Sequence, residues 1–176
     1  MVDLPPYPSA GSPQRLIVGI LRSWFSEFPH IKVGTLIPQD MSGSMPFVLV
    51  RTDRRTGRES GVSNDERFLR TARIGVEVFT SGLDAEATGY DIEESAQLAI
   101  FHAHRNQIVV PGVGSISAIT SSTNIARVSD YATSTGVVQY ASLPKGAVRH
   151  EAVYQFLVRP PVGGAKNNAF VPSRYS

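Results

Sequence analysis

The chain has 176 residues, of which 41% are hydrophobic and 18% charged, so it is long enough to bury the core of one globular domain. Its formal net charge of +2 is too small to indicate nucleic-acid binding by itself. There is no cysteine, which excludes disulfides and thiolate metal sites, and there is neither a signal-peptide pattern nor an apolar run long enough for a bilayer, so we expect a soluble, non-secreted protein.

The N-terminal region combines a proline-rich segment with a helical pattern. Residues 1–11 contain three prolines, and we expect them to form an extended arm. Ser12 followed by Pro13 is typical of a helix start, and Pro29 ends the pattern. Apolar residues recur at helical spacing between these limits: Leu16, Ile17, Ile20, Leu21, Trp24 and Phe28. We expect Trp24, the only tryptophan, to anchor the core.

Two strands are predicted next, over residues 31–37 and 47–51, with a loop over residues 40–45. The second strand is apolar on both faces, which is typical of a central strand. A long polar segment follows, over residues 52–70, and loops of this length in compact domains are usually functional or disordered. Residues 51–73 hold seven arginines against four acids, a local net charge of +3. We expect an extended hairpin whose arginines contact a partner or line a channel: Arg54, Arg55, Arg58, Arg67 and Arg70.

The clearest strand of the sequence leads directly into its longest helical pattern. Apolar residues alternate with others over residues 72–79, as expected of a β-strand. Helical spacing then runs over residues 84–107. Asp84 is the predicted N-cap, and Asp91 is an alternative start because Glu94, three residues on, completes a capping box.

The long helix has two distinct faces. One face predicts packing on a sheet through small and apolar side chains: Ala85, Ile92, Ala96, Ala99, Ile100 and Ala103. Tyr90, Leu98 and Phe101 project from the opposite face, so either they contact a second molecule or the helix is rotated and they belong to its core side. The helix carries five acids against one arginine, a local net charge of −4. We interpret Glu93 and Glu94 as solvated acids and as candidates, with the three apolar residues, for an oligomer interface.

Further strand patterns follow over residues 114–119, 137–143 and 149–159, and Pro160 and Pro161 end the last one. Residues 160–176 are predicted to be a flexible C-terminal tail, which leaves a single domain over residues 12–159.

These elements predict an α/β protein of the α+β type: a mainly antiparallel β-sheet with two α-helices packed on one face, a long hairpin loop and a flexible C-terminal tail. The predicted core contains Trp24, Ile74, Val76, Val78, Ile92, Tyr154 and Phe156. With Trp24 in the core, Trp24→Ala is expected to cost about 3–5 kcal/mol.

Motifs for catalysis and cofactor binding are weak. His102 and His104 lie two residues apart on the predicted helix, so they point to different sides and cannot share a metal ion. Gly112 and Gly114 lack the third glycine and the following helix of a dinucleotide site, and neither a Walker-type lysine nor a nucleophile elbow is present. We therefore expect no catalytic, cofactor-binding or metal-binding residues and no cofactor, and an enzyme is the minority interpretation.

The order of elements (helix, two strands, long loop, strand, long helix, further strands, tail) resembles the tail terminator, or tail-completion, proteins of long-tailed bacteriophages. The segments that carry the resemblance are residues 46–51, residues 72–79, the helix after Asp84 and residues 153–159. The resemblance lies in pattern and order rather than in a signature motif. The polar segment, residues 126–146 and the chain beyond Pro160 lie outside it.

The resemblance implies a small α/β domain without catalytic residues that forms a hexameric ring, caps the tail tube and offers the surface to which the filled head attaches. Its partners would be further copies of itself, the tail tube protein and a head-completion or connector protein. The ring would lie in the virion, at the head-proximal end of the tail, and it would be assembled in the host cytoplasm. DNA would pass through its channel without specific binding. The alternatives are a head–tail connector (stopper) protein, a tail tube subunit, and a small α/β enzyme or ligand-binding domain.

Overall fold

The structure is a computed structural model that describes residues 12–52, 70–128, 143–144 and 146–161. Its elements in chain order are α1 (Pro13–Trp24), β1 (Lys32–Gly34), the 3-10 helix η1 (Ser42–Ser44), β2 (Phe47–Thr52), β3 (Arg70–Thr80), α2 (Ala85–Arg105), β4 (Val109–Val110), β5 (Gly114–Ser122), β6 (Ala126–Val128) and β7 (Val148–Arg159). The predicted arm, most of the polar segment with its hairpin, the strand at 137–143 apart from Leu143, and all but the start of the predicted tail lie outside the described residues.

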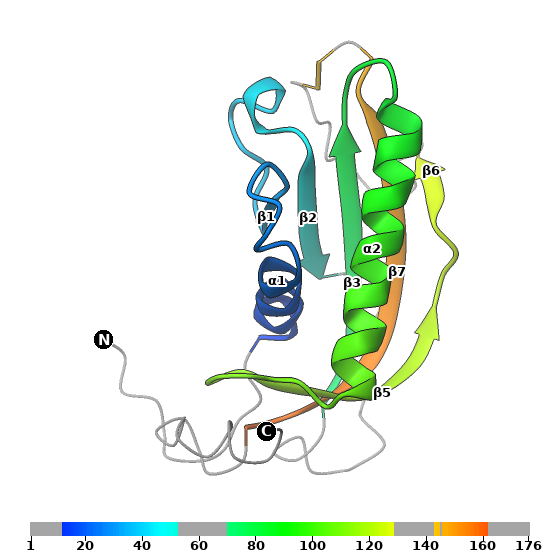
Figure 1. Ribbon diagram of the computed structural model, residues 1–176. Coiled ribbons are helices and arrows are strands. Elements are labelled where there is room, and N and C mark those ends of the chain that lie inside the picture. Colours follow the sequence, from blue (N-terminus) through cyan, green and yellow to red (C-terminus); the bar gives the residue numbers. More distant parts are fainter. Residues whose placement is uncertain (1–11, 53–69, 129–142, 145, 162–176) are drawn as a thin grey trace.

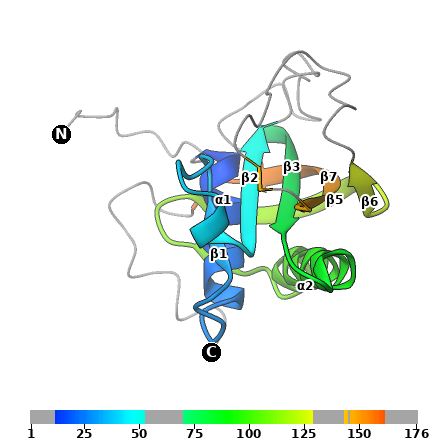
Figure 2. The same cartoon turned by 90° about the horizontal axis from the view of Figure 1, so that it is seen from above.

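One curled sheet carries the fold, with the strand order β1-β2-β3-β7-β5-β4, and β6 also pairs with β7 (Figure 2). Only β1 and β2 pair in parallel, and the other described pairs are antiparallel. The central pair is β3 with β7, which runs from Arg70 opposite Val158 to Thr80 opposite Val148. Both helices cover the same face of the sheet (Figure 1). The predicted fold class is therefore confirmed.

The main core lies between the helices and the sheet. Six of the seven predicted core residues are buried there: Ile74, Val76, Val78, Ile92, Tyr154 and Phe156. All six residues of the predicted inner stripe of α2 are also buried. The helix is continuous from Ala85, so the alternative start at Asp91 is not used. Because this stripe is mostly alanine, the axis of α2 lies close to β3 and β7.

Trp24 does not lie in the core, contrary to the prediction. Helix α1 ends at Trp24, and the next residue, Phe25, turns inward, where its side chain is 5% exposed. Trp24 is 39% exposed and lies against α2, where its indole N–H donates a hydrogen bond to Ser95 Oγ at 3.0 Å. The flank of α2 thus supplies a hydrogen-bond partner for the indole N–H at the protein surface.

A second, smaller cluster covers the other face of the sheet. The chain after β1 passes through η1, and Met41 packs there with Phe47, Leu49 and Phe79. This cluster explains why β2 is apolar on both faces, as the sequence indicates. The first predicted strand is shorter than expected, since β1 covers only Lys32–Gly34. Strand β6 was not predicted, because it is three residues long and mostly exposed.

The exposure of Trp24 revises the expected cost of its removal. Trp24→Ala should lower the free energy of unfolding by about 1–2 kcal/mol, since it loses partly exposed apolar area and one hydrogen bond. Phe25→Ala should cost about 3–5 kcal/mol, because it empties a core site. Urea denaturation of the two variants measures the difference, and equal costs would contradict the placement of Trp24.

Candidate functional site on helix α2

Both ends of α2 are fixed by hydrogen bonds to neighbouring segments. At the N-terminal end, Thr80 Oγ1 donates to the carbonyl oxygen of Ala85 at 2.6 Å. At the C-terminal end, the backbone and side-chain N–H groups of Asn106 both donate to the carbonyl oxygen of His102 at 2.9 Å. The predicted N-cap Asp84 stands at the N-cap position but makes no capping hydrogen bond through its side chain. Residues that directly adjoin α2 thus satisfy backbone carbonyl groups at both of its ends.

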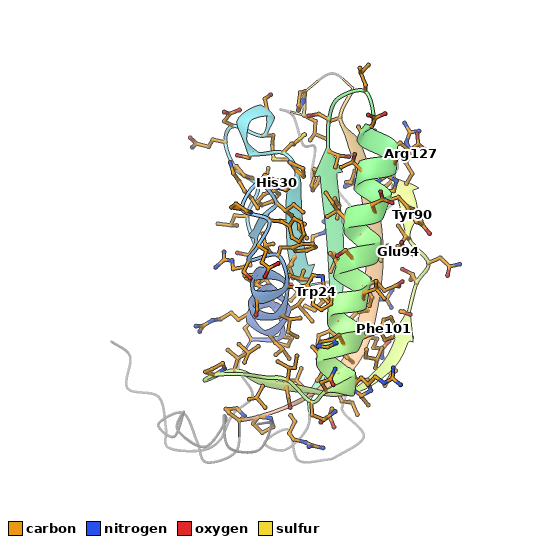
Figure 3. All side chains as sticks on the ribbon, in the orientation of Figure 1. Trp24, His30, Tyr90, Glu94, Phe101 and Arg127 are labelled. Atoms are coloured by element: carbon orange, nitrogen blue, oxygen red, sulfur yellow. The ribbon has the colours of Figure 1, made fainter. Side chains whose placement is uncertain are left out.

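The outer side of α2 exposes three large apolar residues. Tyr90 is 46% exposed, Leu98 58% and Phe101 38%. Figure 3 shows Tyr90, Glu94 and Phe101 along this side of the helix. Of the two interpretations that the sequence left open, the exposed one is correct, and the helix is not rotated. A role for these residues in assembly stays a prediction.

Trp24 is a further exposed aromatic residue, on the flank of α2 that faces α1. Its ring centroid lies 5.4 Å from that of His102 on α2, with an interplanar angle of 51°. The contact with His102 and the hydrogen bond to Ser95 hold the indole in one position while leaving part of it exposed. We refer to the exposed residues Trp24, Tyr90, Leu98 and Phe101 together as the aromatic surface, although Trp24 lies between α1 and α2 and Tyr90 and Phe101 lie on the other flank of α2 (Figure 3).

The charges around α2 are mostly acidic. Glu86 forms an ion pair with Arg127 of β6 at 3.0 Å, and both side chains are exposed. Glu94 is exposed, as its candidate role requires. Of the candidate arginines, Arg54, Arg55, Arg58 and Arg67 lie outside the described residues. Arg70 is described only through its backbone, as the first residue of β3.

Glu93 is buried, which contradicts its interpretation as a solvated interface acid. It has no exposed surface, because consecutive helix residues are rotated by about 100° and Glu93 therefore turns toward β7 while Glu94 faces solvent. Neither carboxyl oxygen of Glu93 has a hydrogen-bond partner among the described residues. Burial, and next the charges of Glu151 and Glu77, raise the pKa of Glu93 well above its usual range.

Two further polar residues of β7 lie beneath α2. His150 is buried opposite Gly89, where an added Cβ would lie 2.6 Å from His150 Nδ1. Burial is the main cause that lowers the pKa of His150, which favours the neutral ring. Burial, and next the charge of Glu93, raise the pKa of the Tyr154 hydroxyl, and Gln97 opposes them only in part. The glycine inside a helix was the one sequence signal for this polar cluster.

Glu93, His150 and Tyr154 are residue types that act as general acids and bases. However, Glu93 and Tyr154 have no exposed surface, so a substrate cannot reach them in this conformation. Over the described ranges, no three histidine, aspartate or glutamate side chains converge to hold a metal ion. Neither α1 nor α2 has the length and apolar character needed to span a bilayer.

A second charged network lies on the opposite face of the sheet, centred on Glu77. Glu77 has no exposed surface, and its carboxylate pairs with the guanidinium groups of Arg51 and, at 3.3 Å, Arg149. Arg51 also reaches Glu151, at 3.8 Å. It does so across Gly75, where an added Cβ would lie 3.9 Å from Arg51 Cγ. This network ties together β2, β3 and β7.

No protein-family model matches the chain, and no curated protein matches it significantly.

Glu93 should make stability depend on pH. Because its pKa is raised in the folded state, its stabilising contribution is complete below the ordinary pKa of glutamate and is lost as the pH rises through the folded pKa. Relative to the unsubstituted protein, Glu93→Gln should therefore gain stability as the pH rises above the ordinary pKa of glutamate, by about 1.4 kcal/mol for each pH unit up to the folded pKa. Denaturation of both proteins at each pH measures this difference in stability. His150 is present in both proteins, so its contribution largely cancels. Glu94→Gln, at the exposed neighbouring position, is the matched control, and curves for Glu93→Gln that run parallel to those of the unsubstituted protein would refute the assignment.

Removing the acid at the centre of the second network should be costly. Glu77→Ala leaves Arg149 buried without its carboxylate, and this should lower the free energy of unfolding by about 3–5 kcal/mol. Glu151→Ala removes a longer and partly exposed contact and should cost at most about 1 kcal/mol. Thermal or urea denaturation of the two variants compares them directly, and a small effect of Glu77→Ala would show that its ion pairs do not stabilise the sheet.

Proposed function

We propose that the protein is a structural component of a long-tailed bacteriophage, which forms a ring, caps the tail tube and provides the interface for head–tail joining. The single observation that carries the proposal is the aromatic surface, which exposes large apolar side chains on a helix whose inner face is mostly alanine. Exposed clusters of this kind usually mark a contact with another protein. A heterologous contact that closes on itself gives a cyclic assembly.

The sheet edges direct assembly toward this helical surface. On the β1 side, the guanidinium of Arg22 donates to the carbonyl oxygen of Val33 at 3.0 and 3.2 Å, and Gln14 Nε2 donates to that of Val50 at 2.7 Å. These contacts occupy carbonyl groups that a further strand would need. On the other side, β5 has two register shifts in its pairing with β7, and such irregularities disfavour regular strand addition.

The phage role itself rests on the resemblance in the order of elements. The confirmed α+β fold, with two helices on one face of the sheet, agrees with the small α/β domain that the resemblance implies. In this proposal the partners are further copies of the chain in a hexameric ring, the tail tube protein and a head-completion or connector protein. DNA passes through the channel without specific binding.

The arginine-rich segment is assigned to a protein contact in this proposal. Its flanking residues, Thr52 and Arg70, lie at the same end of the sheet, because β2 and β3 are antiparallel. Acids are interspersed among its arginines and reduce the local positive charge. The arginines are Arg54, Arg55, Arg58, Arg67 and Arg70. We therefore favour docking on the tail tube over binding of duplex DNA, which would also hinder passage of the genome.

A second candidate function is that of a small enzyme or ligand-binding domain. The observation in its favour is the buried pair of Glu93 and Tyr154, in which the charge of Glu93 acts on the Tyr154 hydroxyl. This function would require α2 to move away from β7 so that a ligand could enter. A connector protein or a tail tube subunit is also compatible with the aromatic surface, but a tube subunit should polymerise into long tubes in isolation.

Ring formation provides the test of the proposal. Analytical ultracentrifugation of the protein, alone and with tail tubes, should detect a closed oligomer, and the double substitution Leu98→Ser and Phe101→Ser should yield a folded monomer, because it removes apolar contact area. Leu36→Ser is the matched control. Leu36 is also an exposed apolar residue, with 81% of its surface exposed, but it belongs to the segment between β1 and η1 and not to α2. A protein that stays monomeric at high concentration and in the presence of tubes would refute the ring.

A further inference from the structure

The outer face of α2 combines exposed apolar side chains with exposed acids. At about 100° per residue, these side chains fall within about 100° of the helix circumference, so they share one face. We refer to them as the acidic face: Tyr90, Asp91, Glu94, Leu98 and Phe101. The face extends about 16 Å along the helix axis, at about 1.5 Å per residue. Figure 3 shows Tyr90 and Phe101 on the flank of α2 away from α1.

The charge of the acidic face disfavours its pairing with the same face of another copy. A twofold contact would bring Asp91 and Glu94 of the two copies together, and like charges across an interface oppose association. Duplex DNA, which is a polyanion, is disfavoured for the same reason. The occupant of this face should therefore offer apolar area together with positive charge.

The side of the molecule formed by α1, β1 and the turn between them offers both. We refer to its exposed residues as the basic side: Arg15, Arg22, Phe28, His30 and Lys32. Residues 12–37 carry three cations against one acid, Glu27, which gives a local net charge of +2. Phe28 is 50% exposed, and its ring centroid lies 6.2 Å from that of His30. The basic side thus complements the acidic face in charge and supplies an aromatic side chain.

Hydrogen bonds hold the basic side in place. The backbone N–H of Phe28 donates to the carbonyl oxygen of Phe25 at 2.9 Å, and the N–H of Ile31 donates to that of Phe28 at 2.9 Å. Because Phe25 is buried, the turn is anchored to the core. Lys32 Nζ donates to the carbonyl oxygen of Gly43 at 3.0 Å. Little conformational freedom would therefore be lost when a partner docks here.

The cations of the basic side also keep their charge available. Arg22 and Lys32 donate to carbonyl oxygens, which carry no formal charge that would neutralise them. By contrast, Arg51 and Arg127 form ion pairs with acids of their own copy. The basic side is therefore better suited than these two arginines to attract the acids of another molecule.

The two surfaces lie on different sides of the molecule. Strand β1 is at one edge of the sheet, and α1 lies on the same side, whereas α2 covers β3 and β7 (Figure 1). The acidic face points away from α1 at Tyr90 and Phe101. Each copy can therefore use both surfaces at once, with a different neighbour at each.

We propose that the acidic face of one copy docks on the basic side of the next copy. The contact is heterologous, because each copy presents its acidic face to one neighbour and its basic side to the other, and repetition closes a ring. This inference rests on the proposed ring and names the two surfaces that meet at each junction.

Charge reversal in two separate full-length variants tests this pairing. One variant carries Asp91→Lys with Glu94→Lys, and the other carries Arg15→Glu with Lys32→Glu. Each variant alone should associate about tenfold more weakly or worse, because like charges then meet at every junction. An equimolar mixture should restore closed rings, since the two variants can alternate around a hexamer and opposite charges again meet at every junction. Sedimentation measures the mass, with tail tubes added where the unsubstituted ring requires them.

The matched control for charge reversal is Arg159→Glu. Arg159 is exposed and, like Lys32, makes one hydrogen bond through its side chain to a neighbouring segment, to Ser117 Oγ at 3.2 Å. It belongs to neither surface, so this variant should assemble like the unsubstituted protein. Lys32→Glu alone, with the same change in net charge, should assemble more weakly.

Cross-linking provides a second measurement that leaves the charges unchanged. The sequence contains no cysteine, so only introduced thiols react with a flexible bismaleimide. Tyr90→Cys with Phe28→Cys in one chain should give covalent chains of three or more copies, because each copy is joined to two neighbours. Either substitution alone should leave the protein mostly uncross-linked, since equivalent residues do not meet in a heterologous contact. Phe28→Cys with Arg159→Cys is the control and should give no such chains.

The outcomes separate this contact from the ring itself. If the unsubstituted protein forms rings and the charge-reversed variants do so equally well, the ring stands and the docking inference is wrong. If both variants are folded by circular dichroism but their mixture forms no ring, the two surfaces do not meet and the inference is also wrong. If a variant does not fold, or if no oligomer forms even with tubes and the proposed function fails, cross-linking at high concentration decides: covalent chains support the pairing of the two surfaces, and their absence overturns it.

Discussion

The close approach of α2 to β3 and β7 governs much of this structure. Gly89 leaves room for His150, and the alanines of the inner stripe, such as Ala96 and Ala99, let the helix lie near the sheet. The inner face of α2 is narrow, with Ile92 and Ile100 as its only large apolar side chains, and it encloses Glu93, while Tyr90, Leu98 and Phe101 lie on the outside. The aromatic surface and the buried acid are therefore two consequences of one packing arrangement.

The two faces of the sheet differ in whether a buried carboxyl group is paired with a cation. On the outer face, Glu77 is paired with Arg51 and Arg149, so its removal leaves a buried cation and is costly. Beneath α2, Glu93 lacks a hydrogen-bond partner among the described residues, and its neutral form is favoured. The central strand pair is thus tied together by charges, whereas the contact of α2 with the sheet weakens when Glu93 ionises.

Local periodicity accounts for what the sequence could predict. The helical repeat of α2 and the alternation in β3 and β7 determine which side chains are buried, so the fold class and six of seven core residues follow from them. Trp24 was misplaced because its environment depends on where α1 ends and on the neighbouring Ser95. Glu93 was wrongly predicted to be solvated, because the orientation of α2 on the sheet decides which of the two adjacent acids is buried. The short β6 exists only through its pairing with β7, which no local pattern records.

The small size of the aromatic surface constrains how it could assemble. Stable pairwise interfaces bury about 1,200–2,000 Å² in total, which is more than four partly exposed side chains supply on their own. A single junction of this kind should therefore be weak. In a closed ring every copy is held at two junctions, so breaking one leaves the other in place and the effective local concentration favours its re-formation. A surface of this size fits a protein that is largely monomeric in dilute solution and assembles cooperatively on a template that presents several copies side by side.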